Sequence, residues 1–252
     1  MPKFFVDERD IYSDRIVIAG DDVNHIRKVL RLGPGDRITV CDGKGKDYLV
    51  SIESLNHDSI VTVIISAEKN CAEPLLEVEL FQGIPKADKM DLIIQKCVEL
   101  GVKKIVPITT ERAVIKLQNR EDARNKISRW QRISLEAAKQ CNRGIVPRVE
   151  FPMGFEEALE LCKAADLGII PYEKEHDTRV SLKECIRGEK AAKIAVMIGP
   201  EGGFSEDEIK KAIDSGLKPV TLGPRILRTE TAGIAVLSIL MYELGDVGGL
   251  FY

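Results

Sequence analysis

From Leu75 onward, short apolar segments of strand length alternate with longer segments whose apolar residues repeat at helical spacing. Such alternation predicts a mostly parallel sheet with helices on both faces, because consecutive parallel strands need a crossover helix between them. The expected strands are 75–82, 105–108, 166–171, 193–198 and 218–222, and the expected helices are 88–100, 122–142, 155–164, 205–215 and 229–244. This part of the chain is therefore assigned to the α/β class.

The first 70 residues follow a different pattern. Short runs of β-branched and aromatic residues occupy 4–6, 15–18, 36–41, 47–52 and 59–65, and one short helix is expected at 23–31. Several short strands with little helix predict a small β-barrel. With a linker at 70–74, we expect two domains, 1–72 and 73–252.

Composition excludes several classes of protein. The chain has 252 residues, of which 44% are hydrophobic and 31% charged, which is enough to bury a core. No apolar run reaches the roughly 18 residues of a membrane span, and the N-terminus lacks the pattern of a secretory signal. The six cysteines form no CxxC pair and the three histidines lie far apart. We therefore expect a cytoplasmic protein with reduced thiols, no membrane contact and no metal site.

Charge is unevenly distributed along the chain. The net charge of −3 argues against a nucleic-acid partner, yet Arg112 to Arg148 contain ten Lys or Arg and three Asp or Glu. A basic segment in an acidic protein favours a polyanion such as RNA, although a solvated helix surface is the alternative. Within it, we expect Arg129, Arg132 and Arg143 to share a solvent face of the helix 122–142 opposite Trp130. These guanidinium groups suit phosphates and base edges.

Glycines follow two of the expected strands. Strand 193–198 ends in Gly199-Pro200-Glu201-Gly202-Gly203, and strand 218–222 ends in Gly223-Pro224 before two arginines. The carboxyl ends of parallel strands are where open α/β sheets bind ligands, and glycine lets a ligand approach the backbone. The first loop is neither GxGxxG nor a Walker sequence, which disfavours a dinucleotide or a nucleoside triphosphate. Tight turns without a ligand are the alternative.

A third strand end, Pro171-Tyr172-Glu173, completes the set. If the three strands are neighbours in the sheet, their loops converge on one pocket. Backbone groups of the loops would then recognise an adenine, with Ile226 and Leu227 packed against its faces. The helix at 229–244 is too apolar for a lone surface helix. We expect it to be buried in the core, with part of it at or near an interface between two copies of the chain.

These blocks together resemble the ribosomal RNA small subunit methyltransferase E family, which belongs to the SPOUT class of knotted methyltransferases. The resemblance covers nearly the whole chain in the right order, and its last two blocks are the most specific. The matching residues are His25 with Val29-Leu30-Arg31, Lys86-Ala87-Asp88-Lys89-Met90 with Glu99-Leu100-Gly101-Val102, Glu136-Ala137-Ala138 with Gln140 and Arg143, Ile198-Gly199-Pro200-Glu201-Gly202-Gly203, and Leu222-Gly223 with Arg225-Ile226-Leu227-Arg228-Thr229-Glu230-Thr231-Ala232.

The resemblance implies properties that spacing does not show. The N-terminal barrel would be PUA-like and would help bind RNA, and the second domain would be a SPOUT fold with a trefoil knot. The cofactor would be S-adenosylmethionine, and the protein would be a homodimer in which the partner completes each active site. The substrate would be 16S ribosomal RNA, free or in the 30S subunit, methylated at N3 of uridine 1498.

Site residues follow from the loops and the basic segment. Arg228 and Glu230 are the catalytic candidates; a phosphate clamp, or a salt bridge to Glu230, is the alternative for Arg228. The candidates for cofactor binding are Pro171, Glu173, Ile198, Gly199, Gly202, Gly203, Leu222, Gly223, Ile226, Leu227, Thr231 and Ala232, and those for RNA binding are Arg31, Lys86, Arg112, Arg129, Arg132, Gln140 and Arg143.

Two competing functions remain open, and a third is disfavoured. The chain would be a non-enzymatic RNA-binding module if the glycine loops are only turns, or a SPOUT methyltransferase acting on a different RNA base. A hydrolase with a Cys or Ser nucleophile is disfavoured, because the sequence has no nucleophile elbow and no Cys/His signature.

Overall fold

The computed structural model describes residues 1–113, 120–172 and 180–249. The chain divides into two compact units. The first contains Met1–Glu73 together with Ala138–Val146, and the second contains the rest of the described chain. The first unit is therefore built from two segments that lie far apart in the sequence.

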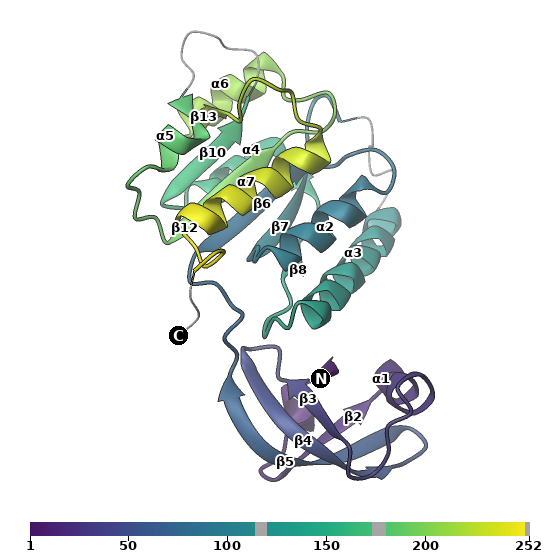
Figure 1. The fold of residues 1–252 in the computed structure, drawn as a ribbon. Helices are drawn as coiled ribbons and strands as arrows, with labels where there is room; N and C mark the ends of the chain where they lie inside the picture. Colours follow the sequence, from purple (N-terminus) through teal and green to yellow (C-terminus); the bar gives the residue numbers. More distant parts are fainter. Residues whose placement is uncertain (114–119, 173–179, 250–252) are drawn as a thin grey trace. The chain divides into compact units, whose positions relative to one another are not determined.

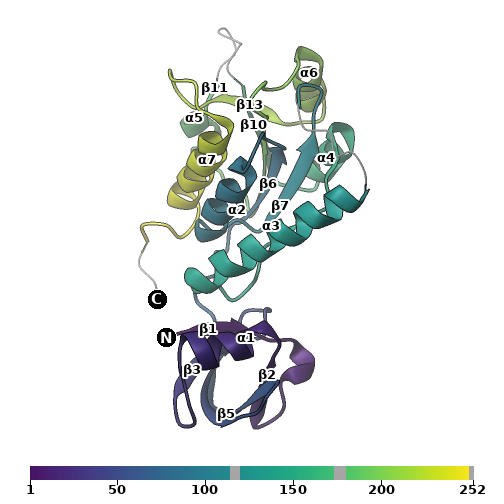
Figure 2. The same cartoon turned by 90° about the vertical axis from the view of Figure 1, so that its right-hand side faces the viewer.

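The first unit is a five-stranded sheet that curls around an apolar core (Figure 2). The strands follow the order β1-β3-β4-β5-β2, and all pairings are antiparallel except the parallel pair β1–β3. Ile16, Ile38 and Val50 are fully buried inside the curl. The elements are β1 (Lys3–Phe5), β2 (Arg15–Ala19), β3 (Arg37–Cys41), β4 (Lys46–Leu55), β5 (Ser59–Lys69), a 3-10 turn (Glu8–Asp10), α1 (Asp21–Asn24) and a π-helical turn (His25–Val29). The curled sheet confirms the prediction of a small, β-rich N-terminal fold.

The loop that follows the long helix α3 (Arg120–Gln140) belongs to this first unit and is held there by a buried ion pair. The Arg143 side chain is 3% exposed, and its Nη2 lies 2.8 Å from Oε2 of Glu73. Oε1 of Glu73 also accepts hydrogen bonds of 2.9 Å from the backbone N–H groups of Gly144 and Ile145. The expectation that Arg143 shares a solvent face with Arg129 and Arg132 is therefore wrong, because its charge is satisfied inside the unit.

The second unit contains an eight-stranded sheet in which every described pairing is parallel. The strand order is β11-β13-β10-β12-β6-β7-β8, with β9 also paired to β7. The strands are β6 (Glu77–Gly83), β7 (Lys104–Thr109), β8 (Arg148–Val149), β9 (Met153–Gly154), β10 (Leu167–Pro171), β11 (Val180–Ser181), β12 (Lys193–Ile198) and β13 (Lys218–Thr221). The predicted parallel sheet is confirmed, and β10, β12 and β13 are neighbours as the pocket hypothesis required.

Helices cover both faces of this sheet (Figure 1). The helices α4 (Phe155–Cys162) and α6 (Glu206–Asp214) pack on one face, where Phe81 and Met197 are fully buried. The helices α2 (Lys89–Glu99) and α7 (Thr229–Glu243) pack against each other and cover the other face. A shorter helix, α5 (Leu182–Ile186), contacts β11 and β13. Among the described helices, none has the length and hydrophobicity needed to cross a membrane.

Helix α7 is buried on only one side. Val236, Leu240 and Met241 are fully buried and face the sheet and α2. Ile239 and Tyr242 stay 38% and 67% exposed. The prediction of a buried helix therefore holds for the face against the sheet, whereas apolar side chains remain uncovered on the opposite face.

The ion pair between Arg143 and Glu73 makes a testable prediction about stability. Removing one partner of a buried pair leaves the other charge uncompensated, which typically costs about 3 kcal/mol or more. We expect Arg143→Ala to lower the free energy of unfolding by about that amount in urea titrations. Arg132→Ala, at an exposed position on α3, is the matched control and should stay within about 0.5 kcal/mol of wild type. Equal stabilities for the two variants would contradict the structural role of Arg143.

Candidate active site

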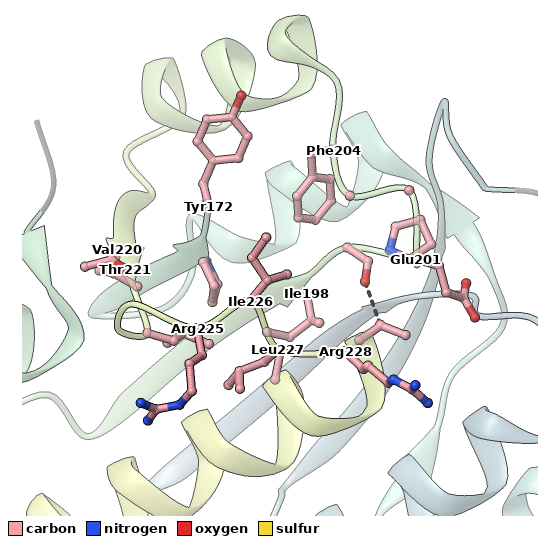
Figure 3. Close-up of a pocket in the computed structure, with 18 of the residues that line it drawn as sticks. Tyr172, Ile198, Glu201, Phe204, Val220, Thr221, Arg225, Ile226, Leu227 and Arg228 are labelled. Atoms are coloured by element: carbon pink, nitrogen blue, oxygen red, sulfur yellow. Dashed lines mark hydrogen bonds between the residues drawn. The ribbon is translucent and has the colours of Figure 1, made fainter. Parts of the chain in front are cut away.

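A cavity of about 580 Å³ lies at the carboxyl ends of β10, β12 and β13 (Figure 3). Its size falls in the range of roughly 300–1,000 Å³ that is typical of small-molecule sites. Because β10 lies between the other two strands, its end forms the middle of the cavity and the two glycine loops form the sides. The sequence predicted that the three loops would converge if their strands were neighbours. The strand order meets this condition, and the loops do converge.

Most of the residues proposed for the cofactor line this cavity. They are Pro171, Ile198, Gly199, Gly202, Gly203, Leu222, Gly223, Ile226, Leu227 and Ala232. Thr231 is exposed and does not belong to the lining, and Glu173 lies outside the described residues. The sequence missed the lining residues Phe204, Val220 and Thr221, and it placed Tyr172 and Pro224 in the predicted pocket loops without making them candidates for the cofactor. All five lie at or shortly after the end of β10, β12 or β13. This position in the sequence, close to the predicted strand ends, is the signal that could have identified them.

A buried chain of hydrogen bonds joins the two glycine loops. The Thr229 hydroxyl, at the start of α7, donates to the carbonyl oxygen of Gly199 at 2.6 Å. The same hydroxyl accepts a hydrogen bond of 2.9 Å from the side-chain amide of Gln82, at the end of β6. Gln82 is fully buried. The loop after β12 and the start of α7 are therefore both attached to the end of β6.

Two glycines at this edge of the sheet are required by the backbone itself. A Cβ on Gly83 would stand 2.6 Å from the backbone nitrogen of Pro200, so only glycine allows the end of β6 to approach the loop after β12 this closely. Gly223 has a φ of +117°, which L side chains rarely adopt, whereas a Cβ there would meet nothing within 4 Å. The glycine requirement at Gly223 therefore comes first from its backbone conformation.

Lys89, on the first turn of α2, holds two carboxylates at the edge of the cavity. Its Nζ lies 2.9 Å from Oε1 of Glu201 and 3.3 Å from Oε2 of Glu230. Glu201 also accepts a hydrogen bond of 3.1 Å from the backbone N–H of Lys86. In the structure, Glu230 thus pairs with Lys89, and the alternative of a salt bridge between Arg228 and Glu230 is not what the structure shows.

The environment of Glu201 favours its charged form. Burial alone would raise the pKa of this carboxyl group, but the hydrogen bond from Lys89 and the backbone N–H groups more than offset it and hold the pKa below its usual value. The hydrogen bond to Glu201 correspondingly raises the pKa of Lys89. Glu201 and Lys89 are therefore both ionised near neutral pH.

Three arginines give the cavity a positive rim. Arg112, Arg225 and Arg228 all line it, and within residues 1–113, 120–172 and 180–249 none of them has a carboxylate partner. Arg112 donates a hydrogen bond to the Gly202 carbonyl at 3.4 Å. Figure 3 shows Arg225 and Arg228 leaving their loop toward different sides of the cavity. Unpaired guanidinium groups at a cavity mouth favour an anionic ligand.

The other residues proposed for RNA binding are spread over both units. Arg31 and Gln140 are exposed in the first unit, and Lys86 and Arg132 are exposed in the second. Arg129 is half-exposed and forms ion pairs with Asp91 and, at 3.2 Å, with Asp88. The positive charge of Arg129 is therefore partly neutralised by helix α2.

The structure offers little support for a cysteine nucleophile. Burial raises the pKa of the Cys41, Cys97 and Cys162 thiols to about 12, so these groups stay protonated near neutral pH. The described residues also contain no group of three or more His, Cys, Asp or Glu side chains that could hold a metal ion.

Two family models match the chain. The model of an RNA methyltransferase domain matches residues 72–241, and that of an RNA methyltransferase PUA domain matches residues 18–65. The first of these alone covers more than half of the chain. It contains every described residue that lines the cavity.

Individual relatives agree with the family models. The chain is 34% identical to the ribosomal RNA small subunit methyltransferase E of Bacillus subtilis, over 90% of this chain and 89% of that protein. The crystal structure of the enzyme of the same name from Neisseria gonorrhoeae, bound to S-adenosyl methionine, superposes with a TM-score of 0.85 at 33% identity, over 98% of this chain and 99% of that one. A putative methyltransferase from Legionella pneumophila, with the bound cofactor SAM, gives 0.86 at 30% identity, over 97% and 98%.

The contacts of Glu201 predict how stability depends on pH. A carboxyl group whose pKa is lowered by folding stabilises the folded state above its unfolded pKa, here 4.5, and this contribution is lost as the pH falls through the lower folded pKa. Glu201→Gln should therefore be less stable than wild type at pH 7, by about 0.5–1 kcal/mol for so accessible a pair. In thermal unfolding, the difference should begin to shrink as the pH falls below 4.5 and should vanish once the pH is below the lowered folded pKa. Glu243→Gln, at an exposed position, is the control, and a difference for Glu201→Gln that is independent of pH would contradict the role of Lys89.

Proposed function

Because the chain belongs to the ribosomal RNA small subunit methyltransferase E family, we propose that it transfers a methyl group from S-adenosylmethionine to N3 of a uridine in 16S ribosomal RNA. The observation that carries this proposal is the cavity at the ends of three parallel strands, with glycine loops on its sides and three arginines on its rim. The loops suit a small cofactor, and the arginines suit the polyanion that must be brought to it.

The described residues fit S-adenosylmethionine. The lining combines apolar side chains with the backbone groups of two glycine loops, which is the combination that recognises an adenine ring and its ribose. Ile226 is 80% exposed, and its side chain points into the cavity between Tyr172 and Ile198 (Figure 3). When bound, the cofactor supplies a methyl group activated by a positively charged sulfonium. Ile226 and Leu227 would hold its adenine.

Arg228 suits the chemistry at the uridine. N3 of uridine is an imide nitrogen that is a poor nucleophile while it carries its proton. Loss of the proton leaves an anion, which a nearby guanidinium stabilises. Arg228 lines the cavity and has no carboxylate partner among the described residues, so its charge is available to such an anion. We assign Arg228 this role and assign Glu230, through its ion pair with Lys89, to holding the start of α7 beside it.

Alignment of the two reactants supplies the rest of the rate enhancement. The loops hold the cofactor, and the arginines hold the RNA, so that N3 and the methyl carbon meet in the orientation for direct transfer. N3 of a paired uridine is blocked by its hydrogen bond, and the target base must therefore be unpaired or flipped out. Arg112 and Arg225, at the rim, are placed to contact the phosphates that flank such a base.

Nucleoside analysis of ribosomal RNA tests the function itself. RNA from cells that lack this protein should lose 3-methyluridine from the small-subunit RNA, and expression of the protein should restore it. Loss of another methylated nucleoside would favour a methyltransferase for a different base. An unchanged nucleoside profile, together with no binding of S-adenosylmethionine in calorimetry, would favour a non-enzymatic RNA-binding module.

Family membership leads us to infer three further properties. The first is a location in the cytoplasm, where ribosomal subunits are found. The second is a trefoil knot, supported by β13 lying next to β10 while the following helix α7 returns to contact β12, β6 and α2. The third is a homodimer, supported by the uncovered apolar face of α7 around Ile239 and Tyr242.

The role of Arg228 gives a kinetic prediction. Arg228→Ala should slow single-turnover methylation by about 10²–10³-fold, the usual cost of removing one group that stabilises a developing anion. Raising the pH should partly restore the rate, because the solvent then deprotonates N3 without help. Binding of RNA should be almost unchanged. A rate equal to wild type across the pH range would end the catalytic assignment.

The matched control for Arg228 is Arg132, an exposed arginine on α3. Arg132→Ala should weaken RNA binding and lower its dependence on salt, because fewer counterions are released. At saturating RNA its rate should stay close to that of wild type. If Arg228→Ala behaved in the same way, with weaker binding and no rescue at high pH, Arg228 would be a phosphate clamp.

The homodimer has its own test. We expect sedimentation of a dimer at micromolar concentration, and we expect the double variant Ile239→Asp with Tyr242→Asp to sediment as a monomer because it places charges on the apolar face of α7. Ile213→Asp, at a 41% exposed position on α6, is the control and should remain dimeric. A wild-type monomer at this concentration would contradict the dimer.

A further inference from the structure

We propose that Gln82 is a positioning residue for the cofactor, which acts through the Thr229 hydroxyl on the carbonyl group of Gly199. This inference rests on the proposed function, because it names what the cavity binds. Gln82 does not line the cavity, whereas Thr229 and Gly199 both do. The hydrogen bond to Thr229 is what connects Gln82 with these two lining residues.

The direction of the hydrogen bonds is fixed by their donors. A hydroxyl group has one hydrogen, and Thr229 uses it on the Gly199 carbonyl, 2.6 Å away. The hydroxyl can then only accept from Gln82, so the amide must point its Nε2 toward Thr229, at 2.9 Å. The same Nε2 donates to the Gly83 carbonyl at 3.0 Å. The chain of bonds thus runs from β6 through α7 to the loop after β12, with one orientation.

The peptide group between Gly199 and Pro200 depends on this chain. Proline has no N–H, so the Gly199 carbonyl is the only group through which that peptide can form a backbone hydrogen bond. The hydroxyl of Thr229 is the partner of this carbonyl. On its other side, Pro200 is packed closely against Gly83. The end of β6 therefore sets the plane of this peptide from two sides, directly below the cavity.

The amide of Gln82 has a cost that an apolar side chain would avoid. Its Oε1 is buried and has no hydrogen-bond partner within the described part of the chain. A buried acceptor without a partner destabilises a protein. A methionine would fill the same space with no such penalty, so the amide is explained by the orientation that it gives to Thr229 better than by a gain in stability.

The test compares side chains of equal shape with and without the hydrogen bonds. Gln82→Met and Thr229→Val should each raise the dissociation constant for S-adenosylmethionine about five- to tenfold in calorimetry, which corresponds to one neutral hydrogen bond. Thr229→Ser keeps the hydroxyl and should bind within about twofold of wild type. The double variant should bind no more weakly than Thr229→Val, because Gln82 acts through Thr229. The KM for the cofactor should rise in parallel, with kcat at saturating cofactor within about twofold.

A matched control separates positioning from general destabilisation. Ser134 is also buried in the second unit, and its hydroxyl donates to the Pro147 carbonyl at 2.7 Å. Ser134→Ala should lower the melting temperature but leave the dissociation constant unchanged. All variants are compared below their melting temperatures. If Gln82→Met does not fold, the comparison of Thr229→Val with Thr229→Ser tests whether the hydroxyl positions the cofactor.

The possible failures are distinguishable. If Gln82→Met and Thr229→Val melt earlier but bind the cofactor within twofold of wild type, the positioning role is overturned and the proposed function stands. Strictly additive effects of the two substitutions would also overturn it, because Gln82 would then act by another route. If the wild-type protein itself binds no S-adenosylmethionine, the proposed function fails instead.

Discussion

The hydrogen bond from the Thr229 hydroxyl to the Gly199 carbonyl joins two loops whose strands are not neighbours. The loop that contains Gly199 follows β12, and Thr229 comes after the loop that follows β13, whereas β10 lies between these strands in the sheet. The loop between β13 and Thr229 must therefore cross the end of β10, and the bond fastens the far end of this loop to the loop after β12, around one cavity. Parallel strands place their carboxyl ends at the same edge. This contact gives that shared edge a cavity with walls on both sides.

The charges around the cavity are separated in a way that suits two different ligands. Lys89 forms ion pairs with Glu201 and Glu230, so the negative charge of these two carboxylates is compensated within the protein. Arg112 and Arg228 keep no carboxylate partner among the described residues. The wall of the cavity is then apolar and backbone-rich, while the rim is positive. A small cofactor inside and a polyanion at the mouth fit this division, because the field of unpaired arginines draws phosphates to the rim.

Sequence patterns predicted the parts of the structure that depend on local periodicity. The strands around the cavity were recognisable as short continuous apolar runs, and most of the helices that cover the sheet as longer segments with apolar residues at helical spacing. The two-residue strands β8, β9 and β11 were not, since so short a segment has no period. Long-range ion pairs were equally hidden: nothing near Arg143 in the sequence indicates that Glu73 will bury it, and nothing near Glu230 indicates Lys89. The basic segment was therefore a weaker guide to RNA contacts than the glycine loops were to the cavity.

Glycine alone does not show that these loops bind a ligand. Gly223 needs its φ of +117° and Gly83 needs its close contact with Pro200 even in a protein that binds nothing. Ile226 is different, because it is 80% exposed and points into the cavity, where a turn without a ligand gains nothing from an uncovered isoleucine. Covering such a side chain is worth about 1.5–3 kcal/mol. The exposed isoleucine therefore argues more strongly for an apolar ring in the cavity than the glycines do, and it places that ring between the two loops that Thr229 holds together.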